Sequence, residues 1–290
     1  EYAVPEKKKI FSFSLPLLFS QLFYQNINII GIIIIGIFLP ASKTGIYTVA
    51  MRVIPFILIP LVAYNAIFSP IISDFFTKHK MEELKNIYKT GSRWVITITL
   101  PIFVLVIFFS KEIVTVFGPG FAESAQIVTL VLIAQMFNVS SGSTGIILSM
   151  TGKTLYNLFN TGILCVLNIV LTLFLISRFG VIGVAYAYTI SIILIQLLQM
   201  GQVWYFYKIQ PYSLGHLKPA ISCLTAFLII RFFENSFSMA HGLISSLVLV
   251  VIFVSIYGIF LIFAGVSQDD RMILEKIRHK ILKRCGAAIQ

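Results

Sequence analysis

The sequence has little charge and few cysteines. Only 11% of its 290 residues are charged, and only three are cysteines. An ordinary soluble domain is about 25% charged, and about a quarter of its unfolded surface stays exposed after folding. Because 58% of this chain is hydrophobic and its mean hydropathy is +0.95, a water-soluble globule could not cover its apolar surface. A soluble enzyme and a secreted disulfide scaffold are therefore excluded as first readings. Membrane channels, transporters, enzymes and scaffolds remain.

Residues that commonly act in catalysis or bind metal ions are also scarce in the apolar runs. Cys165 and Cys223 lie within apolar runs, Cys285 lies in a basic C-terminal segment, and no CxxC or metal-ligand spacing occurs. No Asp or Glu lies deep in an apolar run, although ion-coupled antiporters normally bind the ion at a buried carboxylate. The histidines all fall in predicted loops or in the C-terminal segment: His79, His216, His241 and His279. We therefore expect no catalytic residue, no metal site, no cofactor and no enzymatic activity.

Long apolar runs dominate the rest of the chain. A membrane-spanning helix needs about 20 apolar residues, and backbone polar groups in lipid must be satisfied within the segment. The runs cover residues 10–39, 45–76, 94–109, 121–150, 155–177, 181–207, 217–233 and 242–264. They predict an all-α polytopic membrane bundle of about eight transmembrane helices.

The formal charge of +11 comes from Lys and Arg residues between these runs. They do not form a face interleaved with base-stacking aromatics, so we expect no nucleic-acid partner. With eight spans, most of the 22 Lys and Arg residues fall on the side that carries both termini. This bias predicts that both termini lie in the cytoplasm.

Two basic segments are amphipathic rather than apolar. Residues 78–93 and 267–282 are expected to form helices that lie along anionic headgroups. The simplest role for each is a topology anchor, and a regulatory or partner-binding role is the alternative.

Amide and hydroxyl side chains recur at helical spacing in four runs. They are Ser14, Gln21, Gln25 and Asn28 in the first run, Gln135, Asn138 and Ser149 in the fourth, Asn157, Asn160, Thr161, Asn168 and Thr172 in the fifth, and Gln196, Gln199 and Gln202 in the sixth. Such residues either line a polar cavity or join helices, each contact contributing about 0.6 kcal/mol. Their number favours a shared polar cavity, although each residue alone fits helix packing.

One cation lies inside a run. Arg52 is about two turns into the second run. An embedded Arg is costly unless it meets water or an anion, and its planar fork suits phosphate. A ligand contact and a snorkelling or paired structural Arg both remain open. Prolines at Pro16, Pro55, Pro60 and Pro70 interrupt the first two runs and are candidate hinges.

Several short strings occur in a characteristic order. They are SLP at 14–16, GIYTVAMR at 45–52, FGPGF at 117–121, MTGK at 150–153 and FGVIGVAYAYT at 179–189. Their order and spacing over residues 11–207 resemble the polysaccharide and O-antigen flippases. These belong to the multidrug/oligosaccharidyl-lipid/polysaccharide (MOP) exporter superfamily.

The resemblance implies a domain organisation. The family has two six-helix lobes that face a central cavity, often followed by two further helices. Residues 1–9 would be a remnant of the inter-lobe linker, 10–210 the second six-helix lobe of a MATE-like exporter, 211–265 two additional helices and 266–290 a basic cytoplasmic tail. The absent N-terminal lobe would then be a required partner, because both lobes must rock around the substrate.

The resemblance also implies a substrate. The expected activity is movement of an undecaprenyl-type (polyprenyl) diphosphate-linked oligosaccharide from the inner to the outer leaflet, for cell-surface polysaccharide biosynthesis. Arg52 would meet the diphosphate. Sugar hydroxyls or the path would be contacted by Gln21, Gln25, Asn28, Asn65, Gln135, Asn138, Asn157 and Asn160. Membrane lipid and glycan-assembly enzymes are further expected partners.

Three alternatives remain at this point. A cation-coupled drug or metabolite antiporter of the MATE type shares the fold, and its coupling carboxylate could lie in the absent lobe. A flippase of the peptidoglycan precursor lipid II is closer still. A membrane enzyme or scaffold of glycan assembly belongs to a different class, and it would need acidic residues or partner surfaces that the sequence does not display.

Overall fold

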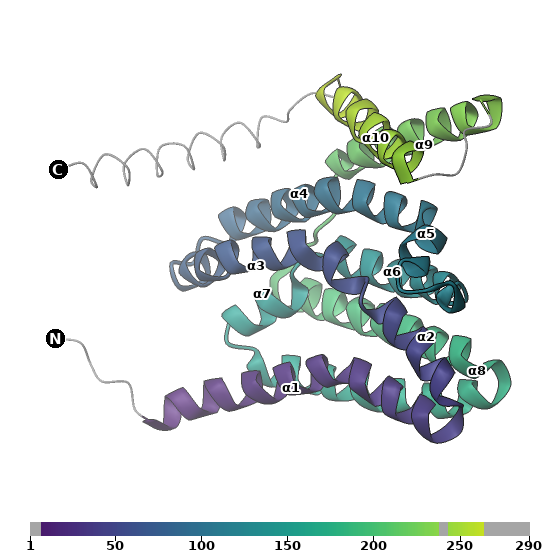
Figure 1. Ribbon diagram of the computed structural model, residues 1–290. Helices are drawn as coiled ribbons and strands as arrows, with labels where there is room; N and C mark the ends of the chain where they lie inside the picture. The colour runs from purple at the N-terminus through teal and green to yellow at the C-terminus, as the bar shows by residue number, and fades with distance from the viewer. Residues whose placement is uncertain (1–6, 238–242, 264–290) are drawn as a thin grey trace, which may run out of the picture. The chain divides into compact units, whose positions relative to one another are not determined.

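The computed structural model describes residues 7–237 and 243–263, and every regular element in these ranges is helical. The chain divides into two compact units after Pro211 (Figure 1). The first unit holds α1 (Lys7–Phe38), α2 (Ala41–Met51), α3 (Ile54–Thr77), α4 (Met81–Phe108), α5 (Ser110–Thr115), η1 (Pro119–Phe121), α6 (Ser124–Ser140), α7 (Thr144–Met150) and α8 (Thr154–Tyr207). The second unit holds η2 (Leu214–His216), α9 (Leu217–Phe237) and α10 (Leu243–Phe263).

Some sequence features lie outside the described residues. These are the greater part of the expected linker at 1–9, the amphipathic segment at 267–282 and the whole expected tail at 266–290.

The predicted class, an all-α polytopic membrane bundle, is confirmed. Among the described residues, five helices are long and apolar enough to cross a membrane, or six when the bent pair α6–α7 counts as one span. The 54-residue α8 counts once here, although two of the predicted runs fall within it. Large apolar side chains such as Ile59, Val62 and Ile67 on α3 are about 60% exposed, as expected for a surface that faces lipid.

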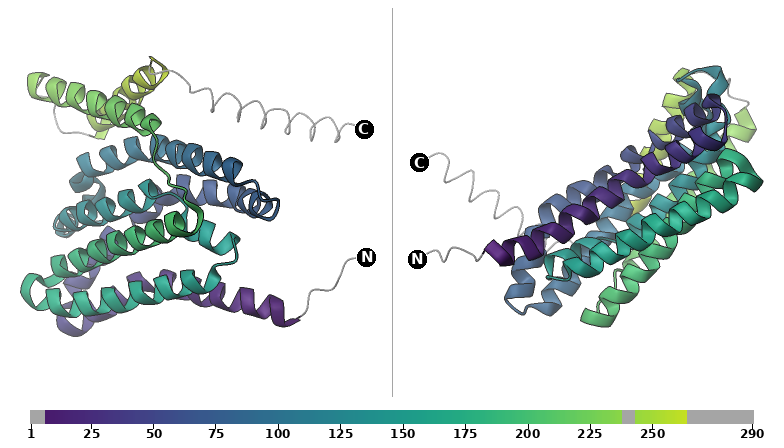
Figure 2. Two further views of the ribbon diagram at one scale, coloured as in Figure 1. Left: turned by 180° about the vertical axis from the view of Figure 1, so that it is seen from behind. Right: turned by 90° about the horizontal axis from the view of Figure 1, so that it is seen from below.

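The core of the first unit consists of two apolar clusters. One surrounds Ile35, Tyr47 and Ile127, where α1, α2, α6 and α8 meet. The other surrounds Leu84 and Leu148, where α3, α4, α7 and the end of α8 meet. The helices of this unit lie side by side with their long axes roughly aligned (Figure 2).

The helix α8 is a hairpin of two antiparallel limbs, 154–179 and 181–207. Gly180 has φ 58° and ψ −139°, which only glycine adopts readily. The Nδ2 of Asn160 donates to Gln202 Oε1 at 2.7 Å, and the Gln202 Nε2 donates back to Asn160 Oδ1 at 2.9 Å. Residues 42 positions apart are therefore neighbours, and the two predicted runs, 155–177 and 181–207, form adjacent spans.

The second predicted run is interrupted at Arg52. Helix α2 ends at Met51, and the amides of Arg52 and Val53 make tight bonds three residues back, to the carbonyls of Val49 and Ala50, at 3.2 Å. Pro55 explains the break, because its ring has no N–H and clashes with the carbonyl four residues earlier. Pro55 lies in the first turn of α3, where proline is tolerated, whereas the other candidate hinges lie further inside their helices.

The other hinge candidates do lie inside helices. Pro16 is buried within α1, and the Ser20 hydroxyl donates to its carbonyl at 2.7 Å. Pro60 and Pro70 are both inside α3.

The prediction of a separate interfacial helix at residues 78–93 is wrong. Residues 81–93 form the first half of α4, which continues without a break to Phe108, and residues 78–80 connect it to α3. Leu84 and Tyr88 are buried in the second apolar cluster rather than turned to headgroups. The segment holds no proline that would end the helix. Gly91 lets α3 approach closely, because a Cβ at this position would overlap the ring of Tyr64.

One end of the first unit gathers three basic loop residues, Lys78, Lys153 and Lys208. The Tyr207 ring lies 5.8 Å from that of Phe76, the Lys153 ammonium lies 4.7 Å from the ring of Phe206, and the Tyr207 hydroxyl donates to Thr151 at 2.6 Å. We call this the basic end. The opposite end carries the ion pair of Lys43 with Glu123 at 2.6 Å.

The second unit is a packed pair of helices. Helices α9 and α10 contact each other, and Cys223 on α9 and Phe253 on α10 are both buried. Both helices are rich in apolar residues.

Candidate substrate-binding site

Arg52 occupies the break between α2 and α3. It lies 11 residues, or about 16 Å at 1.5 Å per residue, from the start of the 37-residue apolar stretch Ala41–Thr77. The side chain is exposed, and no ion pair or hydrogen bond joins its guanidinium to another described residue. A cation within an apolar span that has no protein partner needs water or an anion.

A groove of about 430 Å³ opens beside Arg52. It is lined by Gly36, Ala41, Thr44, Gly45, Thr48, Val49, Arg52, Phe117 and Phe121. The Thr44 hydroxyl oxygen is buried and has no hydrogen-bond partner among the described residues. The groove therefore combines one cation, threonine hydroxyls and two aromatic rings, a donor set that suits a phosphorylated or sugar-bearing group.

The polar residues along one face of α1 are also accessible. Gln21 and Gln25 are exposed, four residues apart on one face of the helix. Asn28 continues the stripe, is half-buried, and has an Oδ1 atom without a partner in the described part of the chain. These amides have unused hydrogen-bonding capacity.

The amides of α6 have protein partners instead. Gln135 is buried, donates to the Tyr188 hydroxyl at 2.6 Å and accepts from Asn138 Nδ2 at 3.0 Å. Asn138 also donates to the Tyr24 hydroxyl at 3.3 Å and accepts from Gln196 Nε2 at 2.7 Å. These bonds join α1, α6 and the second limb of α8 into one network.

The network continues past the bend between α6 and α7. The Thr144 hydroxyl lies 3.2 Å from Gln196 Oε1 and 3.1 Å from Gln199 Oε1. Gln199 Nε2 donates to Asn157 Oδ1 at 3.4 Å, and Asn157 Nδ2 donates to the Ser149 hydroxyl at 3.1 Å.

Two further predicted residues also bond to protein groups. Asn65 on α3 accepts a hydrogen bond from Ser143 beside the bend, and Asn160 pairs with Gln202 across the two limbs of α8.

The predicted residues thus fall into two sets. The structure places Arg52, Gln21 and Gln25 on exposed surface, with Asn28 half-buried beside the two glutamines. It places Asn65, Gln135, Asn138, Asn157 and Asn160 in interhelical hydrogen bonds. Sequence reasoning missed the tyrosines of the network, Tyr24 and Tyr188, because an aromatic residue in an apolar run has no signature that separates a hydrogen-bonded hydroxyl from plain packing.

The network predicts a measurable stability contribution. Replacing Gln196 by leucine is expected to lower the free energy of unfolding by about 1–3 kcal/mol, because Asn138 and Thr144 lose a buried partner. In a double-mutant cycle with Asn138→Leu, the coupling energy is expected to be about 0.6–1.7 kcal/mol. Denaturation in detergent measures both.

A matched control for this cycle is Asn26→Leu. Asn26 is exposed and bonds only within its own helix, to the Leu22 carbonyl at 2.7 Å, so its replacement is expected to change stability by less than about 0.5 kcal/mol. Equal losses in Gln196→Leu and Asn26→Leu would contradict a structural role for the network.

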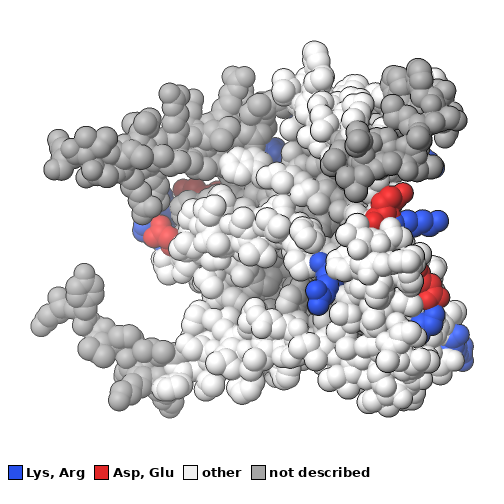
Figure 3. All heavy atoms as spheres, in the orientation of Figure 1, with Lys and Arg blue, Asp and Glu red and all other residues white. Residues whose placement is uncertain are grey.

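Charged side chains occupy only a small part of the described surface on the face shown in Figure 3. In the face drawn in Figure 3, most of the described surface is white, with Lys, Arg, Asp and Glu atoms gathered in a few patches. No group of three or more His, Cys, Asp or Glu that could hold a metal ion occurs among the described residues.

The chain is similar to known proteins of glycan biosynthesis. A family model described as "Polysaccharide biosynthesis protein" matches residues 2–126. A probable low-salt glycan biosynthesis flippase of the archaeon Haloferax volcanii is 28% identical over 162 residues, covering 54% of this chain and 34% of that protein. The probable flippase AglR of the same archaeon is 29% identical over 166 residues, covering 56% and 35%.

Solved structures show the same fold. The lipid II flippase MurJ in an inward closed conformation superposes with a TM-score of 0.69 at 17% identity, over 90% of this chain and 55% of that one. An outward-facing multidrug resistance MATE transporter of the MOP superfamily superposes with a TM-score of 0.57 at 20% identity, over 79% and 55%. The chain therefore spans about a third of the curated relatives and about half of these structural neighbours.

Proposed function

We propose that the intact protein is a polysaccharide flippase of the MOP superfamily and moves a polyprenyl-diphosphate-linked oligosaccharide from the inner to the outer leaflet. The family-model match over residues 2–126 and the similarity to two archaeal flippases support this proposal. It acts as a transporter rather than an enzyme, in a bacterial or archaeal cell membrane with both termini in the cytoplasm. The observation that carries the proposal is Arg52, an exposed cation without a protein partner among the described residues, in a break of an apolar span.

The chemistry of the substrate fits the exposed set of residues. A diphosphate needs a cation that can donate two parallel hydrogen bonds, which the Arg52 fork supplies. Sugar hydroxyls need neutral donors and acceptors, which the exposed amides of Gln21 and Gln25, with Asn28 beside them, supply. The threonines and phenylalanines of the groove would hold the first sugar beside the diphosphate.

The hydrogen-bonded amides take a supporting role in this proposal. Gln135, Asn138, Asn157, Asn160 and Asn65 hold the helices in register, so that the exposed face keeps its shape. We also propose that the helix break at Arg52–Pro55, together with the interruptions at Pro16, Pro60 and Pro70, lets α1 and α3 bend during alternating access. The lobe that faces this site would be the N-terminal half of such a transporter, and glycan-assembly enzymes would deliver the substrate.

The test is reconstitution of the intact protein in vesicles with a fluorescent lipid-diphosphate oligosaccharide. We expect the fluorophore of flipped molecules to become accessible to a membrane-impermeant quencher at a rate that depends on the protein. A lipid that carries the fluorophore without diphosphate is expected to flip at the background rate. If both lipids flip equally, or neither flips, the proposal fails.

Lipid II transport is a second candidate, because the MurJ structure superposes with a TM-score of 0.69 over 90% of the chain. Its substrate carries the same diphosphate, so Arg52 serves both readings. The two candidates are separated by adding unlabelled lipid II or unlabelled oligosaccharide lipid to the vesicles and measuring which one slows the flipping of the fluorescent lipid more strongly. Stronger inhibition by lipid II would favour lipid II transport. Protein-dependent export of cationic drugs down an ion gradient would instead favour the antiporter.

A further inference from the structure

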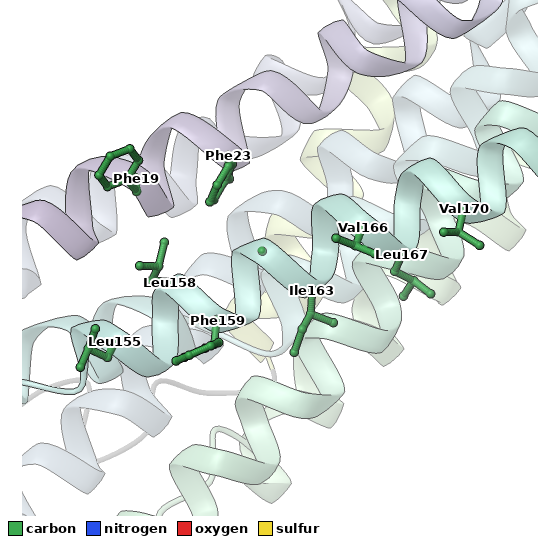
Figure 4. Close-up of a pocket in the computed structure, with 10 residues that line it drawn as sticks. Phe19, Phe23, Leu155, Leu158, Phe159, Ile163, Val166, Leu167 and Val170 are labelled. Carbon is green, nitrogen blue, oxygen red and sulfur yellow. The ribbon is translucent and has the colours of Figure 1, made fainter.

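An apolar groove of about 810 Å³ runs between α1 and the first limb of α8, away from Arg52 (Figure 4). Phe19 and Phe23 line it on α1. The α8 side is lined by Leu155, Leu158, Phe159, Gly162, Ile163, Val166, Leu167 and Val170. From Leu155 to Val170 the groove follows the helix for about 22 Å at 1.5 Å per residue, which exceeds half of the hydrocarbon core of about 30 Å.

The groove and the polar stripe occupy different faces of α1. At 100° per residue, Gln21 and Gln25 point nearly opposite to Phe19 and Phe23. All four side chains are exposed. The polar face fits the proposed transport path, whereas the apolar face is not explained by it.

The lining does not resemble a surface for another helix. Helices in lipid gain no hydrophobic driving force from association, and their interfaces are rich in small residues that allow close approach. Here Gly162 is the one small residue, and the others are large and apolar. A flexible hydrocarbon chain can follow such a concave surface without needing polar partners.

A cation, Lys153, precedes the first residue of α8 and lies two positions before Leu155, where the lining of the groove begins. Tyr156 is 43% exposed and stands two helical turns from Ile163 on the same stripe of α8. The Lys153 ammonium lies 5.6 Å from the Tyr156 ring and 4.7 Å from the Phe206 ring. An interfacial Tyr and a Lys beside an apolar groove match the order of headgroup and chain in an anionic lipid.

We propose that this groove, the α1–α8 groove, binds one hydrocarbon chain of an anionic membrane phospholipid whose phosphate lies at Lys153. The chain fills the space over Gly162, and the phosphate meets the ammonium at the basic end. A Lys near the membrane surface contributes about 1 kcal/mol of attraction to anionic lipid. The site is independent of the proposed transport activity.

The experiment uses the intact protein in zwitterionic bilayers with a trace of phosphatidylglycerol that carries a photoreactive diazirine in its chain. After irradiation, mass spectrometry maps the labelled residues. We expect labelling along residues 155–170 to exceed labelling at Ile59, Val62 and Ile67 of α3, which are exposed and apolar, by about fivefold, which corresponds to about 1 kcal/mol.

A variant and its matched control test whether the hydrocarbon chain of the lipid lies in the groove. Gly162→Leu fills the groove, and no other atom lies within 4 Å of the added Cβ, so labelling is expected to fall to the level of the α3 face. Gly201→Leu is the matched control, since Gly201 lies in the same helix with equally open space but outside the groove. Val166→Phe narrows the groove from its exposed side and replaces Gly162→Leu if that variant does not fold.

Two further variants test the headgroup. Lys153→Gln is expected to abolish the preference for the anionic probe over a phosphatidylcholine probe with the same chain. Lys208→Gln is the control, because Lys208 packs 4.3 Å over the Trp204 ring at the same end of α8 but outside the groove. The preference is expected to persist in this control.

Several outcomes would overturn the proposal. If residues 155–170 are labelled equally in the wild type and in Gly162→Leu, or no more than the α3 face, the probe contacts the groove only as ordinary surrounding lipid. Absence of lipid label together with cross-links to polypeptide would mean that protein covers the groove. Displacement of the probe by polyprenyl phosphate but not by phosphatidylglycerol would assign the groove to the tail of a polyprenyl lipid. An unchanged headgroup preference in Lys153→Gln would remove Lys153 from the site.

Discussion

Replacing Arg52 by glutamine in the intact protein is expected to lower the rate of oligosaccharide-lipid translocation about 10- to 100-fold. A hydrogen bond to a charged group contributes about 1.5–3 kcal/mol, and each 1.4 kcal/mol is a tenfold change. Glutamine keeps a polar side chain of moderate length but removes the charge. Since no described residue pairs with the guanidinium, its loss leaves no protein charge uncompensated, and the amount of folded protein should not fall.

Two companion variants make the Arg52 result specific. Arg52→Lys retains the charge but not the two-pronged donor geometry, so we expect a rate between those of the wild type and Arg52→Gln. Arg178→Gln is the matched control. Arg178 is also exposed and stacks on the Phe174 ring at 4.8 Å, but it lies outside the groove beside Arg52, and a rate within twofold of the wild type is expected. If Arg52→Gln transports as fast as Arg178→Gln at equal protein amounts, Arg52 does not bind the diphosphate.

Apolar length and helical spacing were sufficient to predict the membrane bundle. A run of about 20 apolar residues has one stable form in lipid, so its composition alone predicts a helix. The boundary at Gly180 was also predictable, because the short interval 178–180, which holds a cation and a glycine, separates two such runs. The same logic failed for residues 78–93, where amphipathic spacing fits an interfacial helix and a partly buried helix equally well, and packing against α3 and α7 decided between them.

The spacing of polar residues along a helix did not predict which groups their side chains contact in the fold. Helical periodicity shows that Gln135 and Asn138 share a face of α6, but the same face can meet water or another amide. In the structure it meets Tyr188, Tyr24 and Gln196. These partners lie 50 or more positions away along the chain, and no local pattern in the sequence pairs them. Arg52 was easier to interpret, because a cation in an apolar run is anomalous whatever surrounds it.

The second large effect is expected at Gly183, just after the turn of the α8 hairpin. A Cβ at this position would lie 2.3 Å from the Leu175 carbonyl oxygen and 2.6 Å from its carbon. Both are backbone atoms that cannot rotate away, so Gly183→Ala must separate the two limbs. Overpacking of this kind costs about 1–3 kcal/mol and sometimes more, and we expect Gly183→Ala to lower the free energy of unfolding by about 3 kcal/mol.

The same substitution at Gly201 should have the opposite sign. Gly201 lies in the second limb of the same helix, and no atom is within 4 Å of an added Cβ. Alanine there removes the conformational freedom of glycine and is expected to stabilise the protein by about 0.5–1 kcal/mol. Thermal unfolding of the two variants in one detergent measures the difference. Because Asn160 and Gln202 pair across the limbs, Gly183→Ala should also weaken the coupling between these two residues in a double-mutant cycle, whereas Gly201→Ala should leave it intact. Equal stabilities for the two alanine variants would mean that the limbs do not pack as closely as the hairpin requires.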